Sequence, residues 1–156
     1  MAAPENYHAA TLPSNVGHVF GVSRPVCVDQ TRIDQFAQCT GDDQWIHVDV
    51  ARARAESPFG TTIAHGLLIL SLIPVAQYEL GVYPHDARSV LNYGIEKVRF
   101  LAPVPAGMSL VMRVELSAVE EKGPGRFLVR CTNTACDAAA PDKKVMVAES
   151  LGMVLV

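Results

Sequence analysis

Charged residues are scarce in this chain of 156 residues. Only 19% of the residues are charged and 49% are hydrophobic, a balance that predicts a folded core rather than disorder. The net charge of −3 and the pI near 5.9 leave no excess of Lys and Arg. Phosphate binding depends on clustered basic residues, and no RNP, zinc-finger or phosphate-loop pattern is present. We therefore expect one folded domain that does not bind nucleic acid.

The spacing typical of cysteine metal sites and a secretory leader are also missing. No Cys-x-x-Cys pair occurs, and the cysteines lie in apolar or strand-like segments, so we expect reduced, partly buried thiols rather than disulfides or a zinc site. These residues are Cys27, Cys39, Cys131 and Cys136. The first six residues lack the basic start and apolar run of a secretory signal, which predicts a cytoplasmic protein.

The apolar stretch from Ile63 to Leu80 does not fit a membrane span. A spanning helix needs about 20 mainly apolar residues, whereas Pro74, Gln77 and Glu79 interrupt this one. Its apolar residues occur on all sides, a pattern typical of a helix wrapped by other structure. We therefore predict one long buried helix over this stretch and no contact with a membrane.

The segments before this helix carry turn and capping signals. Residues 1–14 are polar and Pro-containing, and predict an N-terminal arm, either loose or lying on the body formed by residues 15–156. Residues 16–22 predict a first strand. A short helix is expected to begin at Asp29 or Thr31 and to end at Gly41, and Asp49 is expected to cap a second short helix over residues 50–56.

After residue 88 the pattern changes from helix to strand. Strands are predicted over residues 89–93, 95–101, 110–119, 127–132 and 145–154, separated by turns that contain Pro and Gly. A long helix followed by strands with short turns predicts an α+β fold, in which a curved antiparallel sheet wraps around the helix. Because a free sheet edge can pair with a second copy, we also expect a homodimer.

The most informative segment is GDDQWIH at residues 41–47, followed by AHG at residues 64–66. A carboxylate and an imidazole five positions apart on one loop, Asp42 and His47, can both reach a single water molecule. The first turn of a helix offers unpaired N–H groups to a developing oxyanion. These groups suit the addition of water to, or its removal from, an activated carbon beside a carbonyl group. The alternative is an ordinary turn next to a histidine that packs in the core.

Residues 36–49 (FAQCTGDDQWIHVD), with AHGLL at residues 64–68, resemble the signature of the MaoC-like, R-specific enoyl-CoA hydratases, which have a hot dog fold. In that family the stretch reads approximately Ser-Gly-Asp-x-Asn-Pro-Leu-His, and a His-Gly pair opens the central helix. Gln44 stands where Asn is usual and Trp45 where Pro is usual. This variant is similar to the nodulation-protein-N-like branch. The resemblance extends through residues 92–100 and 103–107, and so covers most of residues 15–154.

The resemblance implies a role for each of five residues. Asp42 and His47 would hold one water molecule, Asp42 taking its proton as it attacks C3 and His47 supplying a proton at C2. Gly66 would donate its backbone N–H to the thioester oxyanion, Gln44 would orient the loop, and Tyr93 would line the acyl or pantetheine channel. Which of the two catalytic groups is the main base stays open, and tight packing is the alternative reason for Gly66.

The predicted function is that of an (R)-specific enoyl-CoA hydratase, which is a (3R)-hydroxyacyl-CoA dehydratase in reverse. The substrate would be a coenzyme A or acyl-carrier-protein thioester, in a pocket near the dimer interface. No metal, flavin or nicotinamide is implied, and a metal site of His47 with Asp43, Asp49 and His65 is not expected because zinc spacing is missing. The alternatives are a hot dog thioesterase and a non-catalytic acyl-thioester-binding subunit.

Overall fold

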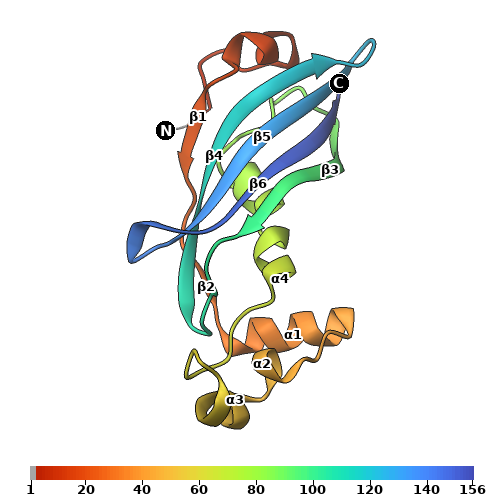
Figure 1. The fold of residues 1–156 in the computed structure, drawn as a ribbon. Coiled ribbons are helices and arrows are strands. Elements are labelled where there is room, and N and C mark those ends of the chain that lie inside the picture. The colour runs from red at the N-terminus through yellow and green to blue at the C-terminus, as the bar shows by residue number, and fades with distance from the viewer. Residues whose placement is uncertain (1–2) are drawn as a thin grey trace.

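A computed structural model describes residues 3–156 as one curved antiparallel sheet with helices behind it and at one end (Figure 1). The strands are β1 (Val19–Val22), β2 (Val26–Val28), β3 (Ser89–Phe100), β4 (Met108–Glu121), β5 (Arg126–Asp137) and β6 (Ala140–Leu155). The helices are η1 (Ala9–Asn15), α1 (Gln30–Thr40), α2 (Trp45–Val48), α3 (Val50–Glu56), α4 (Gly66–Ser71) and α5 (Ile73–Glu79). The strand order is β1-β4-β5-β6-β3, and β2 also pairs with β4.

The sheet confirms the predicted antiparallel strands, with longer bounds. Two segments that were predicted separately, residues 89–93 and 95–101, form the single strand β3, whose register with β6 shifts at Asn92/Gly94 and again at Glu96/Arg99. The first strand begins at Val19 rather than at residue 16, and β2 was not predicted because three residues are too short for a periodic pattern. The face of β4, β5 and β6 toward the helices supplies much of the core.

The central helical segment differs from the single helix that was predicted. It begins at Gly66, because Ile63 runs in an extended bridge with Pro105. It is then interrupted by a turn at Leu72 that separates α4 from α5. Pro74 lies in the first turn of α5, where a helix needs no backbone N–H. Because proline has no N–H, it cannot extend the hydrogen bonds of α4 into α5. The prediction of one helix over residues 63–80 was therefore wrong at its start and in its continuity.

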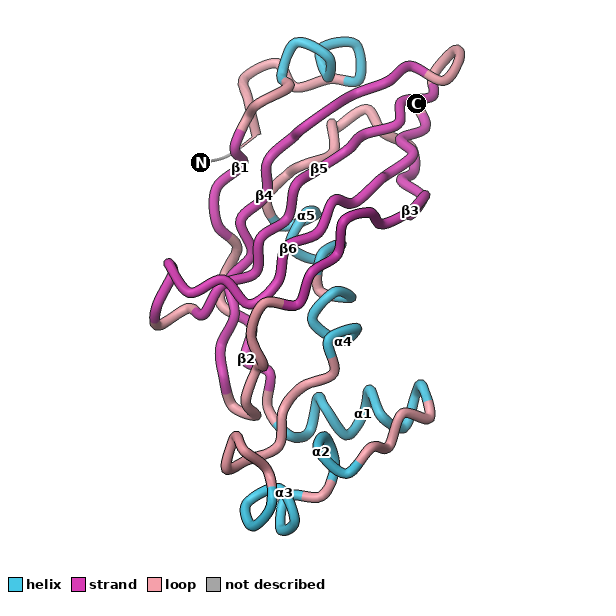
Figure 2. Tube along the Cα trace, viewed as in Figure 1, coloured by secondary structure: helices cyan, strands magenta, loops and turns pink. Residues whose placement is uncertain are grey.

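The helices α4 and α5 are covered by the sheet on one side only (Figure 2). Ile69 and Ile73 are buried against it, whereas Leu67, Val75 and Tyr78 are 61%, 58% and 62% exposed. The prediction of burial on all sides is wrong for a single chain, because one sheet can cover only one face of a helix pair. Within residues 3–156, the structure contains no helix with the length and apolar character to cross a bilayer.

The N-terminal segment and a group of short helices lie at opposite ends of the molecule. The N-terminal segment lies on the body, where Leu12 is fully buried and the Tyr7 hydroxyl donates to the Val82 carbonyl at 2.7 Å. At the opposite end, α1, α2 and α3 form a group below the sheet (Figure 2). The predicted caps are confirmed there: Asp29 begins α1, and Gly41 ends it with a φ of 80°.

The second predicted cap and the predicted thiols also agree with the structure. The Asp49 carboxylate accepts a hydrogen bond from the Arg52 backbone N–H at 2.9 Å, which begins α3. The four cysteines are free, two of them buried and two exposed: Cys131 and Cys136, and Cys27 and Cys39. Burial raises the pKa of the Cys131 thiol to about 12, so that thiol stays protonated and unreactive.

Candidate active site

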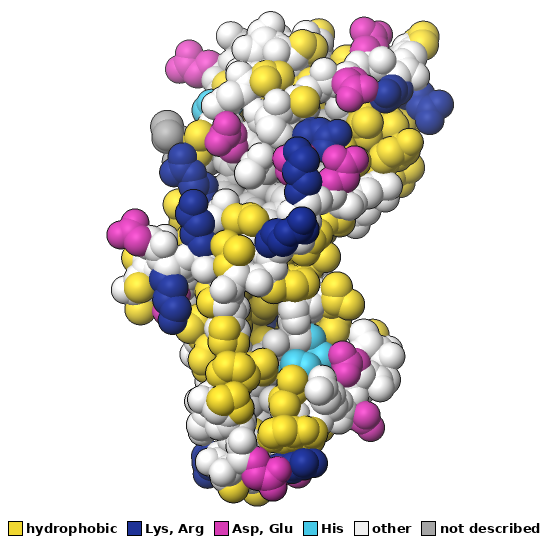
Figure 3. Space-filling model, viewed as in Figure 1, with side chains coloured by type: hydrophobic (Ala, Val, Ile, Leu, Met, Phe, Trp, Pro, Cys, Tyr) yellow, Lys and Arg dark blue, Asp and Glu magenta, His cyan; other side chains and the backbone are white. Residues whose placement is uncertain are grey.

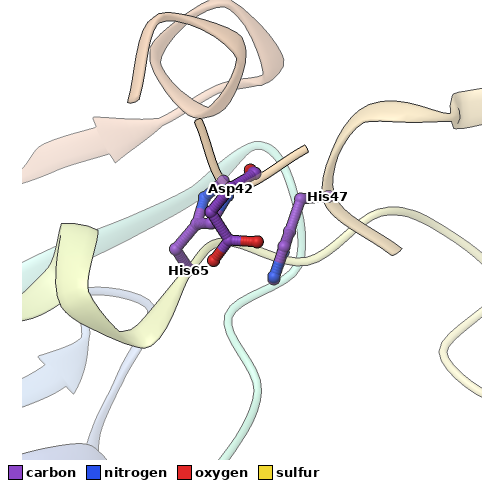
Figure 4. Close-up of side chains that lie close together, drawn as sticks. All are labelled: Asp42, His47 and His65. Carbon is purple, nitrogen blue, oxygen red and sulfur yellow. The ribbon is translucent and has the colours of Figure 1, made fainter. Parts of the chain in front are cut away.

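The structure brings Asp42 and His47 together against the start of α4 (Figure 4). His47 lies on α2 and is buried, and Asp42 lies in the exposed connection between α1 and α2. One carboxylate oxygen of Asp42 and one ring nitrogen each of His47 and His65 all lie within 4.8 Å of one another. A single water molecule can bridge two polar atoms at such a separation. Asp42 and His47 are therefore placed to act on the same water.

The hydrogen bond made by His47 determines which of its ring nitrogens is available. Nδ1 lies 2.6 Å from the backbone oxygen of Ile63, and a carbonyl can only accept, so Nδ1 carries the proton. Burial lowers the pKa of His47, and nearby His65 adds to that effect, while the Ile63 hydrogen bond and Asp42 oppose it. The ring is thus neutral near pH 7, and its Nε2 lone pair is free to accept a proton.

His65 contacts both members of the pair. Its ring stacks on His47 with centroids 3.8 Å apart and planes 27° apart, and its Nε2 donates to the Asp42 carbonyl at 2.9 Å. Its Nδ1 is buried and has no hydrogen-bond partner within residues 3–156. An unsatisfied buried polar atom costs about 1–3 kcal/mol. His65 therefore holds the connection that carries Asp42, 23 residues before it in the chain.

The same three side chains do not form a ready metal site. A tetrahedral ion needs nitrogen lone pairs that converge on it from about 2.0–2.1 Å. The lone pair of an imidazole nitrogen lies in the plane of its ring. Because the rings of His47 and His65 are stacked and nearly parallel, their lone pairs do not converge on one point between them. The arrangement suits a shared water better than an ion.

The backbone of His47 is braced by the side chain of Gln30, which was not predicted to belong to the site. Gln30 on α1 donates to the His47 carbonyl at 2.8 Å, and its side-chain oxygen accepts a hydrogen bond from the buried hydroxyl of Thr62. This brace ties α1, α2 and the segment before α4 into one unit. No local signal predicts it, because Gln30 is 17 residues from His47 and 32 from Thr62.

Gly66 lies at the first position of α4, where a backbone N–H has no partner within the helix. A pocket of about 320 Å³ is lined by Gly66, His47, Ile69 and residues 100–104, among others. A Cβ atom at position 66 would lie 3.0 Å from the ring of Phe100. Close packing on Phe100 is thus one reason for the glycine, and the donor role stays a prediction. Figure 3 shows histidine atoms and an acidic side chain at the surface of the notch below the sheet.

The other two predicted residues lie in different places. Gln44 is exposed and caps α2 through its backbone, its carbonyl accepting from the His47 N–H at 2.9 Å, while its side chain makes no capping bond. Tyr93 is on β3 and lines a separate pocket of about 310 Å³ between β3, β6 and the α4–α5 pair. The structure therefore keeps Gln44 beside His47, and places Tyr93 in another pocket.

A curved antiparallel sheet around a central helical segment, with this loop against the start of that segment, defines a hot dog fold of the hydratase type. Residues 12–137 match the family described as the MaoC like domain. The chain belongs to that family, as the motif in residues 36–49 predicted.

Two relatives and one solved structure illustrate the similarity. The chain is 41% identical over 142 residues to 3-hydroxyacyl-thioester dehydratase Z of Mycobacterium tuberculosis, covering 91% of this chain and 92% of that protein. It is 44% identical over 114 residues to Nodulation protein N of Rhizobium leguminosarum bv. viciae, covering 73% and 71%. The unliganded R-hydratase PhaJ1 of Pseudomonas aeruginosa superposes with a TM-score of 0.70 and 28% identity, over 90% of this chain and 81% of that one.

Proposed function

We propose that this protein is an (R)-specific enoyl-thioester hydratase, which also dehydrates (3R)-3-hydroxyacyl thioesters in the reverse direction. The observation that carries the proposal is the placement of the Asp42 carboxylate and the His47 imidazole within reach of one water molecule, beside a pocket lined by His47 and Gly66. Family membership and the names of the similar dehydratase and R-hydratase support it. In reaction class the protein is a hydro-lyase.

The proposed reaction adds one water molecule across the C2=C3 bond. The water oxygen forms a bond to C3, the π electrons move to the thioester oxygen as an enolate, and the enolate then takes up a proton at C2. One proton of the water passes to the Asp42–His47 pair, and the pair returns a proton to C2. Nδ1 of the neutral His47 ring carries the proton that is donated to the Ile63 carbonyl, so Nε2 starts without a proton. Nε2 can therefore deliver a proton to C2 only after it has accepted one. The Gly66 N–H would stabilise the enolate oxygen.

The proposed substrate is a trans-2-enoyl thioester of coenzyme A or of an acyl carrier protein. Coenzyme A then enters as part of the substrate, and the proposed chemistry needs no metal, flavin or nicotinamide, since general acid–base catalysis moves both protons. A cytoplasmic location stays a prediction of the sequence.

The proposed assembly is a homodimer that pairs through β3. Among residues 3–156, this strand has β6 as its only neighbour in the sheet, which leaves its outer edge open to a second copy. Exposed apolar side chains lie on β3 and on the adjoining helices, a surface typical of an interface: Leu91, Tyr93, Ile95, Leu67, Val75 and Tyr78. Light scattering at micromolar concentration is expected to give the mass of a dimer. A stable monomer with full activity would contradict this assembly.

Incubation with crotonyl-CoA separates the hydratase from its two rivals. We expect loss of the ultraviolet absorbance of the enoyl group, no release of free thiol, and a product that is (3R)-3-hydroxybutyryl-CoA by chiral analysis. Thiol release would identify a thioesterase, and binding without either change would identify an acyl-thioester-binding subunit. Formation of the (3S) product would contradict the proposed stereochemistry.

A further inference from the structure

The pocket that contains Tyr93 has an apolar mouth and a polar inner wall. Its volume is about 310 Å³, and much of its lining is apolar, including Leu67, Leu70 and Ile73 of the helices. Two of its lining residues are both polar and buried: Gln77 is 2% exposed and Ser150 is 6% exposed. Because a buried polar group loses free energy unless it is hydrogen-bonded, the bonds behind this wall determine which group is left for a ligand.

The direction of the hydrogen bonds behind this wall is fixed by one backbone carbonyl. Asn133 is fully buried, and its side-chain nitrogen lies 2.9 Å from the carbonyl of Cys131, which can only accept. The amide of Asn133 is thereby oriented, and its oxygen faces Gln77. Gln77 must then present its nitrogen to that oxygen, at 2.9 Å.

The orientation of Gln77 determines the two remaining bonds. Its nitrogen also donates to the Ser150 hydroxyl oxygen at 2.7 Å, and its own oxygen accepts from the Tyr83 hydroxyl at 2.7 Å. The Asn133 nitrogen donates to the same Ser150 oxygen at 3.0 Å. Ser150 therefore receives two hydrogen bonds, which occupy both lone pairs of its oxygen.

Ser150 is left with one unused hydrogen-bonding group, its own hydroxyl proton. No group within residues 3–156 accepts that proton, and the residue lines the pocket. Ser71, another hydroxyl in the lining, differs because it already donates to the Leu68 carbonyl at 2.7 Å. Of these two hydroxyls, Ser150 is the one with a donor left for a ligand.

We propose that this pocket binds the tail of an acyl thioester that carries an oxygen, as an ether, carbonyl or hydroxyl group, and that the Ser150 hydroxyl donates to that oxygen. The identity of the ligand as an acyl thioester rests on the proposed function. The apolar lining contacts the hydrocarbon on either side of the oxygen. Ser150 acts as a specificity-determining residue, and the reacting carbons stay with Asp42 and His47.

The position of the pocket places this oxygen far from the reacting carbons. Gly66 and Ile69 line the pocket beside His47, whereas Leu67 and Leu70 line the other, so the two pockets border different faces of α4. Gln77, which bonds to Ser150, follows Gly66 by eleven residues and lies on α5, beyond the break at Leu72. Short acyl chains such as crotonyl do not reach it.

The test compares enoyl-CoA substrates of equal length with and without an oxygen in the tail. Trans-2-enoyl-CoA thioesters are prepared with an ether oxygen in place of one methylene at successive positions, and kcat/KM is measured against the all-methylene chain. When the ether oxygen stands at the one chain position that meets Ser150, the kcat/KM of the wild-type protein is expected to be about five- to tenfold higher than for the all-methylene chain. This ratio corresponds to one neutral hydrogen bond. Ser150→Ala should remove the preference, and Ser71→Ala should keep it.

Two controls separate specificity from damage to the fold. Crotonyl-CoA hydration should be unchanged in Ser150→Ala and Ser71→Ala, and circular dichroism should match the wild type. If Ser150→Ala does not fold, Ser150→Cys keeps a side chain of similar size with a much weaker donor, and should reduce the preference.

The outcomes distinguish this inference from the proposed function. Crotonyl-CoA hydration with no preference for any ether, or with a preference that survives Ser150→Ala and Ser150→Cys, overturns the inference and leaves the hydratase standing. Absence of crotonyl-CoA hydration by the wild type overturns the proposed function. Calorimetric binding of the same thioesters then tests the pocket, and equal affinities for ether and methylene tails would overturn the inference as well.

Discussion

Two clusters of polar side chains lie in this chain, and they differ in how completely their hydrogen bonds are satisfied. Where α5 packs on the sheet, Gln77 and Asn133 form a sheet cluster, buried with every side-chain N and O atom of the two residues bonded within the protein. At the other end, His65 keeps a buried nitrogen with no partner in residues 3–156, and His47 keeps Nε2 available. A satisfied cluster stabilises one arrangement of the core, and an incompletely satisfied one is typical of a reactive site.

The comparison predicts that the two clusters respond differently to mutation. Substitution of Asp42 should abolish turnover with little change in stability, because Asp42 is exposed and contributes little to the core. Substitution in the sheet cluster should lower stability and leave the turnover of short substrates intact.

The largest expected effect is the loss of turnover in Asp42→Asn and His47→Gln. Each change removes a proton-transfer group and keeps a polar side chain, so crotonyl-CoA hydration should fall by about 10²- to 10⁴-fold. Asp43→Asn is the matched control, since Asp43 is an exposed carboxylate next to Asp42. Retention of more than about a tenth of wild-type kcat in both variants, well above the level expected for a lost acid–base group, would remove the assignment of catalysis to this loop.

The next largest effect is expected at Gly66. Gly66→Pro removes the backbone N–H and should lower kcat by about 10²-fold or more if that group stabilises the enolate. Proline is otherwise well suited to the first position of a helix. Gly66→Ala is the control, because it adds a Cβ close to Phe100 and keeps the N–H. Equal losses in the two folded variants would assign the effect to packing on Phe100 instead of to the donor.

Asn133→Ala should affect stability rather than catalysis. It removes one of the two acceptors of the buried Gln77 nitrogen and one of the two donors to Ser150, so the free energy of unfolding should fall by about 1–3 kcal/mol. Urea denaturation measures this change, and kcat for crotonyl-CoA should stay close to that of the wild type. A large loss of kcat in folded protein would show that the two clusters are not separate in function.

The smallest effect is expected at His65, which positions Asp42 without touching the reacting atoms. His65→Gln can place its amide nitrogen near the position of the ring Nε2 and still donate to the Asp42 carbonyl, whereas His65→Asn is too short. Misplacement of a catalytic group lowers kcat more than it raises KM, and a loss of about tenfold is expected for His65→Asn. The Gln variant should recover part of that loss. Equal kcat values in the two variants would contradict a positioning role.

Local signals in the sequence predicted the parts of the fold that depend on neighbouring residues. The caps at Asp29, Gly41 and Asp49, and the later strands, follow from side chains within a few positions of one another. The break at Leu72 and the exposed face of α4 and α5 depend on what packs against the helices, which periodicity does not record.

The candidate site also contains residues that could be predicted from local signals and residues that could not. Asp42 and His47 share one short loop, so their proximity could be predicted from their spacing. The Gln30 brace joins segments 17 and 32 residues apart, and no local pattern indicates it. Tyr93 was predicted to line the acyl or pantetheine channel, and the structure places it in the pocket that also contains Ser150. Contacts between distant segments decide these cases, and they become visible only in the folded chain.

The central claim is that Asp42 and His47 act together on one water molecule, and a double-mutant comparison tests it most directly. Crotonyl-CoA hydration is measured for Asp42→Asn, His47→Gln and the double variant, each shown by circular dichroism to be folded. Groups that act as a unit are non-additive, so the double variant should be little slower than the slower single variant. A double variant whose loss equals the product of the two single losses would contradict the shared water.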